Sequence, residues 1–220
     1  MKKEPGSPIL IFALAFTALC SGVCLSVIYA GTLPMIRKNQ AAAIERAIFK
    51  ILPGTSSFEI YEVKNDEMVH FQSDDGSMPE GEAIYRGFDE NGGVTGFAVP
   101  SKGPGFQDDI KLIYGFKPEE DLIVGMQVLE SRETPGLGDK IEKKASFTDC
   151  FLELKVVPEV VANKKGTRTD LNQVDTISGA TISSVAVIRI INQSVNRTQP
   201  LIETFRAQLK PVADTKGETP

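Results

Sequence analysis

The chain has 220 residues, 41% of them hydrophobic, and a formal net charge of −5 at pH 7. This length accommodates one membrane anchor and one globular domain with a substantial core, and it leaves no room for a second domain of that size. Residues 31–220 carry a net charge of −6, because Lys2, Lys3 and Glu4 give the first 30 residues +1, and an acidic domain argues against nucleic-acid binding.

The N-terminal segment predicts a membrane span. No charged residue occurs from Pro5 to Ile36, and a span requires about 20 apolar residues. We expect a short N-terminal segment over residues 1–8 and a transmembrane helix over residues 9–30. A cleavable signal peptide is the alternative, but its apolar region is typically only about 7–15 residues long, and Ile28-Tyr29-Ala30 is a poor cleavage site.

The next segment predicts a stalk helix followed by a sheet. Good helix formers fill residues 41–50, so we expect a juxtamembrane helix within residues 31–54, ending at Pro53-Gly54. Alternating and β-branched stretches separated by turn-forming residues then predict strands. They lie at residues 58–63, 69–72, 83–88, 94–99, 110–116 and 122–129. These strands predict a mainly antiparallel, twisted sheet.

The C-terminal part has helical character. We expect a helix over residues 140–154, an irregular stretch around 163–169, and a helix whose apolar residues recur at helical spacing from Ile182 to Val195. Pro200 is expected to interrupt that helix before another helical piece, and residues 208–220 are expected to form a disordered tail. The predicted fold class is α+β, a single transmembrane helix followed by one domain over residues 55–207 with flanking helices.

One short motif carries most of the functional information. In Asp175-Thr176-Ile177-Ser178-Gly179-Ala180-Thr181, small residues precede the Thr181 hydroxyl, and a helix is expected to begin near it. Unpaired amides at a helix start attract anions such as phosphate. The segment resembles the Asp-x-x-(Ser/Thr)-Gly-Ala-Thr flavinylation motif of the FMN-binding domain, which occurs in the G subunits of Rnf electron-transport complexes and the C subunits of sodium-pumping NADH:quinone reductases. The resemblance implies that Thr181 carries FMN through a phosphoester bond.

The other residues of this acceptor motif have alternative roles. Gly179 and Ala180 remove side-chain bulk from the approach to the hydroxyl, whereas Ser178 could equally be a plain N-cap. Asp175 could be a turn or cap carboxylate, or, as the resemblance implies, part of what a flavin transferase recognises. Ser183 and Ser184 follow the acceptor position, so we expect them to be caps or phosphate contacts.

A second motif lies upstream. The segment Glu133-Thr134-Pro135-Gly136-Leu137-Gly138 resembles the Glu-Thr-Pro-Gly-Leu-Gly loop of the same families, and the Asp139-Lys140-Ile141-Glu142 that follows is more similar to the Rnf branch. Gly136 and Gly138 let backbone approach a flat ligand, Leu137 can lie against a ring face, and Thr134 can hydrogen-bond a ring edge. We therefore assign this glycine loop, Glu133 included, to cofactor binding. A plain Gly-Pro turn is the alternative.

The resemblance implies an electron-carrier protein within a membrane-bound, redox-driven ion-translocating complex of the Rnf type, with no independent catalysis of its own. Its partners would be the other proteins of the complex and a flavin transferase that uses FAD as FMN donor. The basic residues flanking the span are nearly balanced, so only the resemblance places the N-terminus in the cytoplasm and the domain in the periplasm, anchored to the inner membrane. Alternatives are the C subunit of a Na⁺-translocating NADH:quinone reductase and a cofactor-free, membrane-tethered assembly module.

The remaining polar residues suggest no further chemistry. The sequence contains no nucleophile-elbow, phosphate-loop or zinc-protease motif, so we assign no catalytic residue. Three cysteines do not make a disulfide framework, and Cys20 and Cys24, one turn apart, cannot complete a tetrahedral metal site. We assign no metal. The single histidine, His70, is expected to be structural or exposed, and the acidic pairs Asp108-Asp109 and Glu119-Glu120 are expected to be solvated.

Overall fold

Helix α1 (Ser7–Ile51) opens the computed structural model, which describes residues 7–72, 78, 79 and 81–209. The chain divides into two units, Met1–Ala42 and Ala43–Pro220, and α1 contributes to both. Among the residues described, α1 is the one helix long and apolar enough to cross a membrane. The anchor and the stalk are a single helix of 45 residues that contains Pro34, so no helix end separates them near residue 30.

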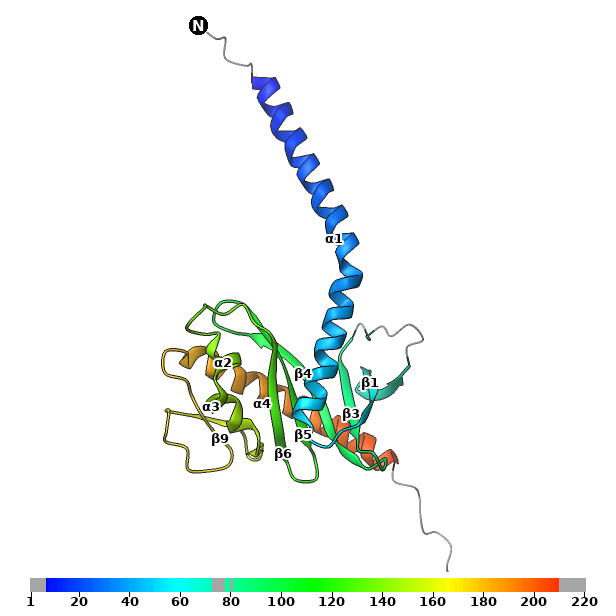
Figure 1. Ribbon diagram of the computed structural model, residues 1–220, viewed down its shortest axis with the longest axis vertical. Coiled ribbons are helices and arrows are strands. Elements are labelled where there is room, and N and C mark those ends of the chain that lie inside the picture. Colours follow the sequence, from blue (N-terminus) through cyan, green and yellow to red (C-terminus); the bar gives the residue numbers. More distant parts are fainter. Residues whose placement is uncertain (1–6, 73–77, 80, 210–220) are drawn as a thin grey trace, which may run out of the picture. The chain divides into compact units, whose positions relative to one another are not determined.

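A seven-stranded sheet forms the centre of the second unit (Figure 1). Its strand order is β2-β1-β3-β4-β5-β6-β7, and all neighbouring strands are antiparallel. The strands are β1 (Ser57–Lys64), β2 (Glu67–Phe71), β3 (Ala83–Phe88), β4 (Val94–Pro104), β5 (Asp109–Lys117), β6 (Leu122–Glu130) and β7 (Leu154–Lys155). The six predicted strands and the antiparallel sheet are confirmed. A separate parallel pair joins β8 (Val161–Asn163) to β9 (Gln173–Asp175).

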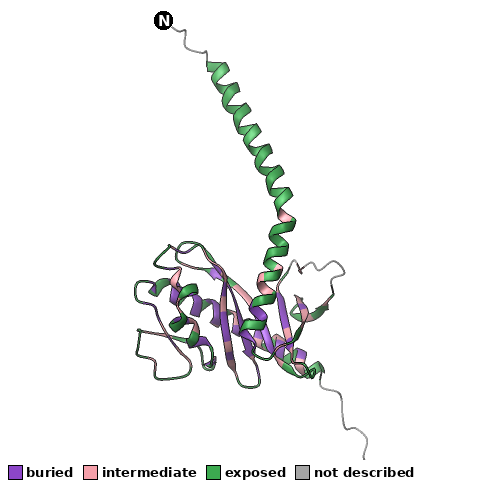
Figure 2. Cartoon of the chain, viewed as in Figure 1, coloured by how far each residue is buried: buried purple, intermediate pink, exposed green. Residues whose placement is uncertain are grey.

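The sheet buries both of its faces. Side chains alternate across a strand, so Val99 and Tyr114, which are paired in the β4–β5 ladder, face the core beneath helix α4 (Thr181–Leu209). Their neighbours Ala98 and Ile113 face a second core, formed with Ile48 and other residues at the end of α1. Figure 2 shows buried residues gathered in the strands and α4, whereas residues 7–32 are exposed along α1.

The helix expected over residues 140–154 is wrong as a single element. The chain instead forms three short turns, α2 (Lys140–Lys143), α3 (Ala145–Thr148) and the 3₁₀ turn η1 (Asp149–Phe151). Lys144 adopts an extended conformation between α2 and α3, with φ −94° and ψ 105°. The end of the segment leaves the helical path because Leu154 and Lys155 pair with β6 as strand β7, while Ile141, Phe147 and Phe151 enter the core, where each is at most 1% exposed.

The expected interruption at Pro200 is also wrong. Helix α4 runs through Pro200 as one element of 29 residues. A proline inside a helix costs about 3 kcal/mol, but the residues beyond it are held by the core, because Ile202 is fully buried and the Phe205 ring lies 4.6 Å from that of Tyr61. The tail predicted from residue 208 onward overlaps the end of α4, and residues 210–220 lie outside the part that the structure describes.

Candidate functional site

A tight turn presents the start of α4. The carbonyl of Ile177 accepts the Ala180 amide at 2.9 Å, which closes a four-residue turn whose third residue, Gly179, has φ 81°. A positive φ at this position is typical of a type II turn and favours glycine. The Ala180 carbonyl then accepts the Ser184 amide at 2.9 Å, so Thr181 is the first residue of the helix.

The hydroxyls near this turn differ in accessibility. Thr181 is exposed, and its hydroxyl makes only a long contact of 3.5 Å to the Ile177 carbonyl. Ser184 is fully buried, where its Oγ donates to Ala180 at 2.9 Å and accepts the Ile177 amide at 3.1 Å. Ser183 is 3% exposed and donates to Glu133 at 2.5 Å. Thr181 and Ser178, which lies in the turn, therefore present their hydroxyls to solvent.

The backbone beside Thr181 offers hydrogen-bond donors. Within the residues that the structure describes, the amides of residues 181–183 have no hydrogen-bond partner. These amides lie at the positive end of a 29-residue helix dipole. Donors of this kind suit an anion bound near the Thr181 hydroxyl.

The glycine loop is a second turn of similar geometry. The Thr134 carbonyl accepts the Leu137 amide at 3.1 Å, and Pro135 and Gly136, with φ 76° at the glycine, occupy the two central positions. This is the sequence pattern of a type II turn. No atom lies within 4 Å of the position that a Cβ would take at Gly136. The tip of the loop is therefore open to solvent, and Leu137 beside it is 49% exposed.

The side chain of Glu133 joins the glycine loop to two other segments of the chain. This side chain is 5% exposed, and Oε1 accepts the amides of Phe106 and Gln107 at 2.8 and 3.0 Å, while Oε2 accepts the Ser183 hydroxyl. Burial by itself raises the pKa of this carboxyl, but the hydrogen bonds from Ser183, Gln107 and Phe106 outweigh it and hold the pKa below its ordinary value. One carboxylate thus joins three segments of the chain.

Two glycines make room for this carboxylate. A Cβ at Gly105 would lie 2.4 Å from Glu133 Oε1, and a Cβ at Gly138 would lie 2.6 Å from Oε2. Such distances are shorter than real non-bonded contacts between carbon and oxygen, so neither position tolerates a side chain while Glu133 stays in place. Glu133 was predicted to bind the cofactor, but both of its oxygens are bound within the protein. Gly138 is likewise buried against Glu133, whereas Gly136 is accessible.

The two predicted motifs meet in space. A carbon added at Gly179 would lie 3.9 Å from Leu137 Cδ2 and 4.0 Å from Lys140 Nζ. The Glu133–Ser183 hydrogen bond makes a second connection between the motifs. The exposed Thr181 hydroxyl, the open loop tip and the Lys140 ammonium consequently belong to one corner of the domain.

Comparison with known proteins assigns this corner to a family. The FMN-binding domain family matches residues 105–196, which include both motifs. The G subunit of the ion-translocating oxidoreductase complex of Methanosarcina acetivorans is 32% identical over 186 residues, which cover 84% of this chain and 91% of that protein. The chain belongs to the family of G subunits of ion-translocating oxidoreductase complexes. Its resemblance to this FMN-binding family is thereby confirmed.

Other relatives agree with this assignment. The G subunit of the Na⁺-translocating ferredoxin:NAD⁺ oxidoreductase complex of Acetobacterium woodii is 28% identical over 197 residues, covering 88% of this chain and 90% of that one. The crystal structure of NqrC from Shewanella oneidensis has a TM-score of 0.57 at 18% identity, covering 81% of this chain and 99% of that chain. The C subunit of the Na⁺-translocating NADH-quinone reductase from Parabacteroides distasonis has a TM-score of 0.53 at 20% identity, covering 67% of this chain and 78% of that one. The two structures confirm the α+β fold.

The residues at the corner fit FMN, the cofactor of this domain family. Thr181 offers a hydroxyl, residues 181–183 offer amides, and Lys140 offers a cation, which together suit a phosphate. The open tip at Gly136 and the exposed Leu137 suit an apolar ring. Thr134 was expected to reach a ring edge, but its hydroxyl donates to Gln107 Oε1 at 3.1 Å.

Asp175 supports the neighbouring loop. Its Oδ2 accepts the Gly166 amide at 2.8 Å, while Oδ1 is buried and has no partner among the residues described. The following residue, Thr176, donates both its amide and its hydroxyl to the Asn163 carbonyl at 2.8 Å. The carboxylate at the end of β9 therefore supports the turn at Gly166, and recognition of Asp175 by a transferase stays a prediction.

Four residues of this corner, Ile182, Val185, Phe106 and Lys140, were not predicted from the sequence to belong to it. Ile182 and Val185 were placed on the apolar face of the helix, yet they are 60% and 42% exposed. The buried face of the first turns is made instead by Ser183, Ser184 and Val187, because small side chains allow α4 to pack closely there. Phe106, beside the Glu133 carboxylate, is 64% exposed, and Lys140 was noted only as part of a motif. For Phe106, the only indication in the sequence was its position, as a large apolar residue directly after Gly105.

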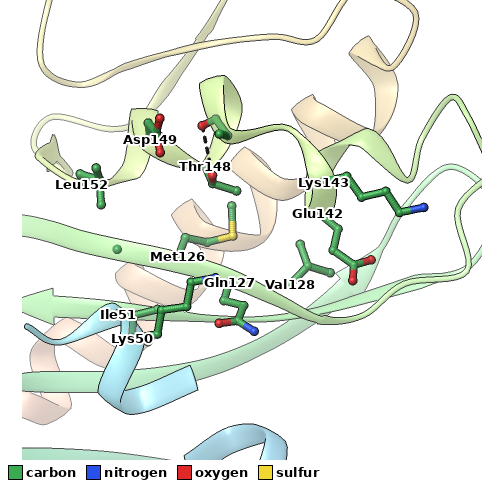
Figure 3. A pocket seen from close by; sticks show the side chains of 12 residues that line it. Lys50, Ile51, Met126, Gln127, Val128, Glu142, Lys143, Thr148, Asp149 and Leu152 are labelled. Carbon is green, nitrogen blue, oxygen red and sulfur yellow. Dashed lines mark hydrogen bonds between the residues drawn. The ribbon is translucent and has the colours of Figure 1, made fainter. Parts of the chain in front are cut away.

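A cavity of about 410 Å³ lies elsewhere in the domain, at the end of α1 (Figure 3). Its lining includes Lys50, Gln127, Glu142, Lys143 and Asp149. No residue of the acceptor motif or of the glycine loop contributes to it. The cavity therefore does not belong to the corner that fits FMN.

Three other residues considered from the sequence, His70, Asp109 and Cys150, have the following surroundings. His70 is exposed and its ring packs edge-on against Tyr61 at 5.5 Å. Asp109 pairs with Lys102 at 3.4 Å, and Cys150 is buried with a free thiol. In the described ranges, no group of three His, Cys, Asp or Glu side chains is arranged to hold a metal ion.

Proposed function

We propose that this chain is the electron carrier of a membrane-bound, redox-driven ion-translocating complex, and that its FMN is joined to Thr181 by a phosphoester bond. The observation that carries the proposal is one exposed threonine hydroxyl at a helix start, preceded by a turn whose Gly179 lies against Leu137 of the open glycine loop. Bound FMN would supply the redox chemistry. The protein would hold the flavin and expose it to its electron donor and acceptor.

Attachment of the flavin is a group transfer without a net electron change. The Thr181 oxygen attacks the phosphorus nearest the riboflavin in FAD, so a bond between Thr181 Oγ and phosphorus forms. The bond from that phosphorus to the bridging oxygen breaks, AMP leaves, and the hydroxyl proton passes to a base of the transferase or to water. Thr181 is suited to this step because its hydroxyl is accessible, whereas those of Ser183 and Ser184 are bound within the protein.

The location follows from the same proposal. Helix α1 would anchor the chain in the inner membrane with its N-terminus in the cytoplasm, and the FMN-binding domain would lie in the periplasm. A covalent bond is useful there because a dissociated FMN would be lost. The other proteins of the complex and a flavin transferase would be its partners, and the names of the M. acetivorans and A. woodii relatives support the first of these.

The attachment is tested by flavin fluorescence of the denatured chain. We would co-express the full chain with an exported flavin transferase and compare wild type, Thr181→Ala and Ser178→Ala. Ser178 is the matched control, because it is the other exposed hydroxyl at the turn. We expect wild type and Ser178→Ala to retain fluorescence in a denaturing gel and Thr181→Ala to lose it. Fluorescence that persisted in Thr181→Ala would disprove the attachment site.

The topology is tested separately. Deleting residues 1–30 should keep the domain in the cytosol, away from an exported transferase, so mass spectrometry should find the chain without the added mass of FMN. Replacing those residues with a cleavable export signal should restore the modification. A fully flavinylated cytosolic domain would show that the periplasmic placement or the transferase requirement is wrong.

A further inference from the structure

We propose that Lys140 binds the phosphate that links the flavin to Thr181, and that its charge positions this phosphate during attachment. The proposal rests on the proposed attachment of FMN at Thr181. It extends the phosphate site from the helix start to a side chain of the glycine-loop segment, and it assigns Lys140 a role as a positioning residue.

The backbone holds Lys140 beside the acceptor turn. Its amide donates to the Leu137 carbonyl at 3.3 Å, and its own carbonyl accepts the Lys144 amide at 3.0 Å. The side chain is half-buried, and Nζ lies 4.0 Å from the position of a Cβ at Gly179, two residues before Thr181. The absence of a side chain at Gly179 keeps the space between this ammonium and the helix start open.

The charges around Lys140 leave its ammonium available. The nearby Asp139 pairs with Lys143 at 2.7 Å, and this hydrogen bond holds the pKa of Asp139 below its ordinary value. Glu133 is bound by two amides and by Ser183. Within the part of the chain that is described, no carboxylate lies within 4 Å of Lys140 Nζ. A cation in this position favours the binding of an anion.

A phosphodiester is the anion that this arrangement fits. It retains one negative charge, and it would lie between the amides of residues 181–183 and the ammonium of Lys140. Hydrogen bonds in which one partner is charged are stronger than neutral ones. Before the transfer, the same groups can receive the phosphate of FAD that is to be attached, so removal of the charge should slow the modification as well as change the environment of the product.

The test compares two lysines of the same short helix. The full-length chain in detergent would be modified by purified transferase and FAD, and the initial rate of covalent flavin incorporation would be measured for wild type, Lys140→Met, Lys140→Arg and Lys143→Met. We expect the rate of Lys140→Met to fall about three- to tenfold, and Lys140→Arg to retain most of the wild-type rate. Lys143→Met, whose lysine pairs with Asp139, should stay within about twofold of wild type.

Phosphorus NMR of the loaded chains gives a readout that does not depend on rate. The phosphodiester resonance of Lys140→Met should shift from that of wild type, while that of Lys143→Met should not, and thermal unfolding should show that both variants are folded. An unchanged rate, or a slower rate with an unchanged resonance, would overturn the phosphate contact. If wild type itself incorporated no flavin, the proposed attachment would fail, which is a distinct result.

Discussion

The start and the middle of helix α4 use the same residue types in opposite ways. In its middle, Ser194 Oγ lies 2.6 Å from Ser101 Oγ and 2.9 Å from the Tyr114 hydroxyl, and Thr198 is 1% exposed beside them. At its start, Thr181 is exposed and the first amides have no partner in the described residues. The hydroxyls in the middle join the helix to the sheet, whereas the hydroxyl at the start remains available for chemistry.

The difference between the two regions is one of accessibility and not of residue type, because Thr181 is exposed whereas Thr198 is 1% exposed. Burial raises the pKa of Tyr114 to about 12, against the opposing effect of its hydrogen bonds to Ser194 and Thr198. Its hydroxyl is enclosed between α4 and β5. A helix start can avoid this enclosure because its first residues can extend beyond the sheet. The amides of these first residues also lack partners within the helix.

The largest effect is expected from removing the carboxylate that joins the corner together. Glu133→Ala would leave the amides of Phe106 and Gln107 and the Ser183 hydroxyl without their acceptor. We expect the free energy of unfolding of the full chain in detergent to fall by about 2–4 kcal/mol, measured by urea denaturation. Glu130→Ala is the control, because Glu130 is 40% exposed and pairs with Lys111 at the surface. Its loss should cost less than about 1 kcal/mol, and equal losses would show that Glu133 does not join the segments.

The next effect is expected from Gly136→Val, and its control separates loss of contact with the flavin ring from backbone strain. Gly136→Val introduces a β-branched residue at φ 76°, at a cost of about 1–3 kcal/mol. We expect the chain to keep covalent flavin, but with an altered native absorbance spectrum and midpoint potential. Gly92→Val is the matched control, since Gly92 has φ 79° and is equally open, in the turn between β3 and β4. If both variants kept the parent spectrum and potential, the glycine loop would lie away from the flavin.

A smaller effect is expected from removing the hydroxyl of Ser184 near the start of α4, and it can be compared with removal of the Ser194 hydroxyl in the middle of the helix. Ser184→Ala removes the acceptor of the buried Ile177 amide, so we expect a loss of about 1–2 kcal/mol in the free energy of unfolding and slower flavin incorporation at Thr181. Ser194→Ala should cost about 0.5–1 kcal/mol and leave incorporation unchanged, because Ser194 lies far along the helix and its Oγ contacts other hydroxyls. Slower incorporation in both variants would mean that general stability, and not the turn, controls the modification.

The smallest effect concerns pH. Because the folded protein lowers the pKa of Glu133 below 4.5, its carboxylate contributes stability that is fully present above pH 4.5 and is lost as pH falls through the lower, folded-state value. We expect the free energy of unfolding to decline on acidification below pH 4.5, and the decline to be shallower in Glu133→Gln. Thermal unfolding in a series of acidic buffers measures this, and identical pH profiles would show that other carboxylates account for the decline.

The sequence determined much of the architecture. Alternation and turn residues predicted all six long strands to within a few residues, since these signals depend on neighbours along the chain. The two type II turns could also be anticipated, because Pro135-Gly136 and Gly179 supply the backbone angles that such turns require. Thr181 was predicted from a motif to be the reactive hydroxyl, and the structure places it, exposed, at the first residue of α4.

Only the tertiary structure decided the elements that depend on burial. Pro200 stays within α4 because Ile202 and Phe205 are held in the core. The helix expected over residues 140–154 breaks, and the residues at its end, Leu154 and the following Lys155, pair with β6 instead. No local pattern contains that information, since the packing partners come from distant parts of the chain.

The composition of the candidate site was decided in the same way. The sequence could not show that Glu133 faces inward to Ser183 while Lys140 lies beside Gly179, because both contacts join segments that meet only in the folded domain. It likewise placed Ile182 and Val185 among the apolar residues at helical spacing, whereas the structure exposes them next to Thr181. Periodicity specifies which residues share a face of a helix, but the position of the sheet determines which face is covered.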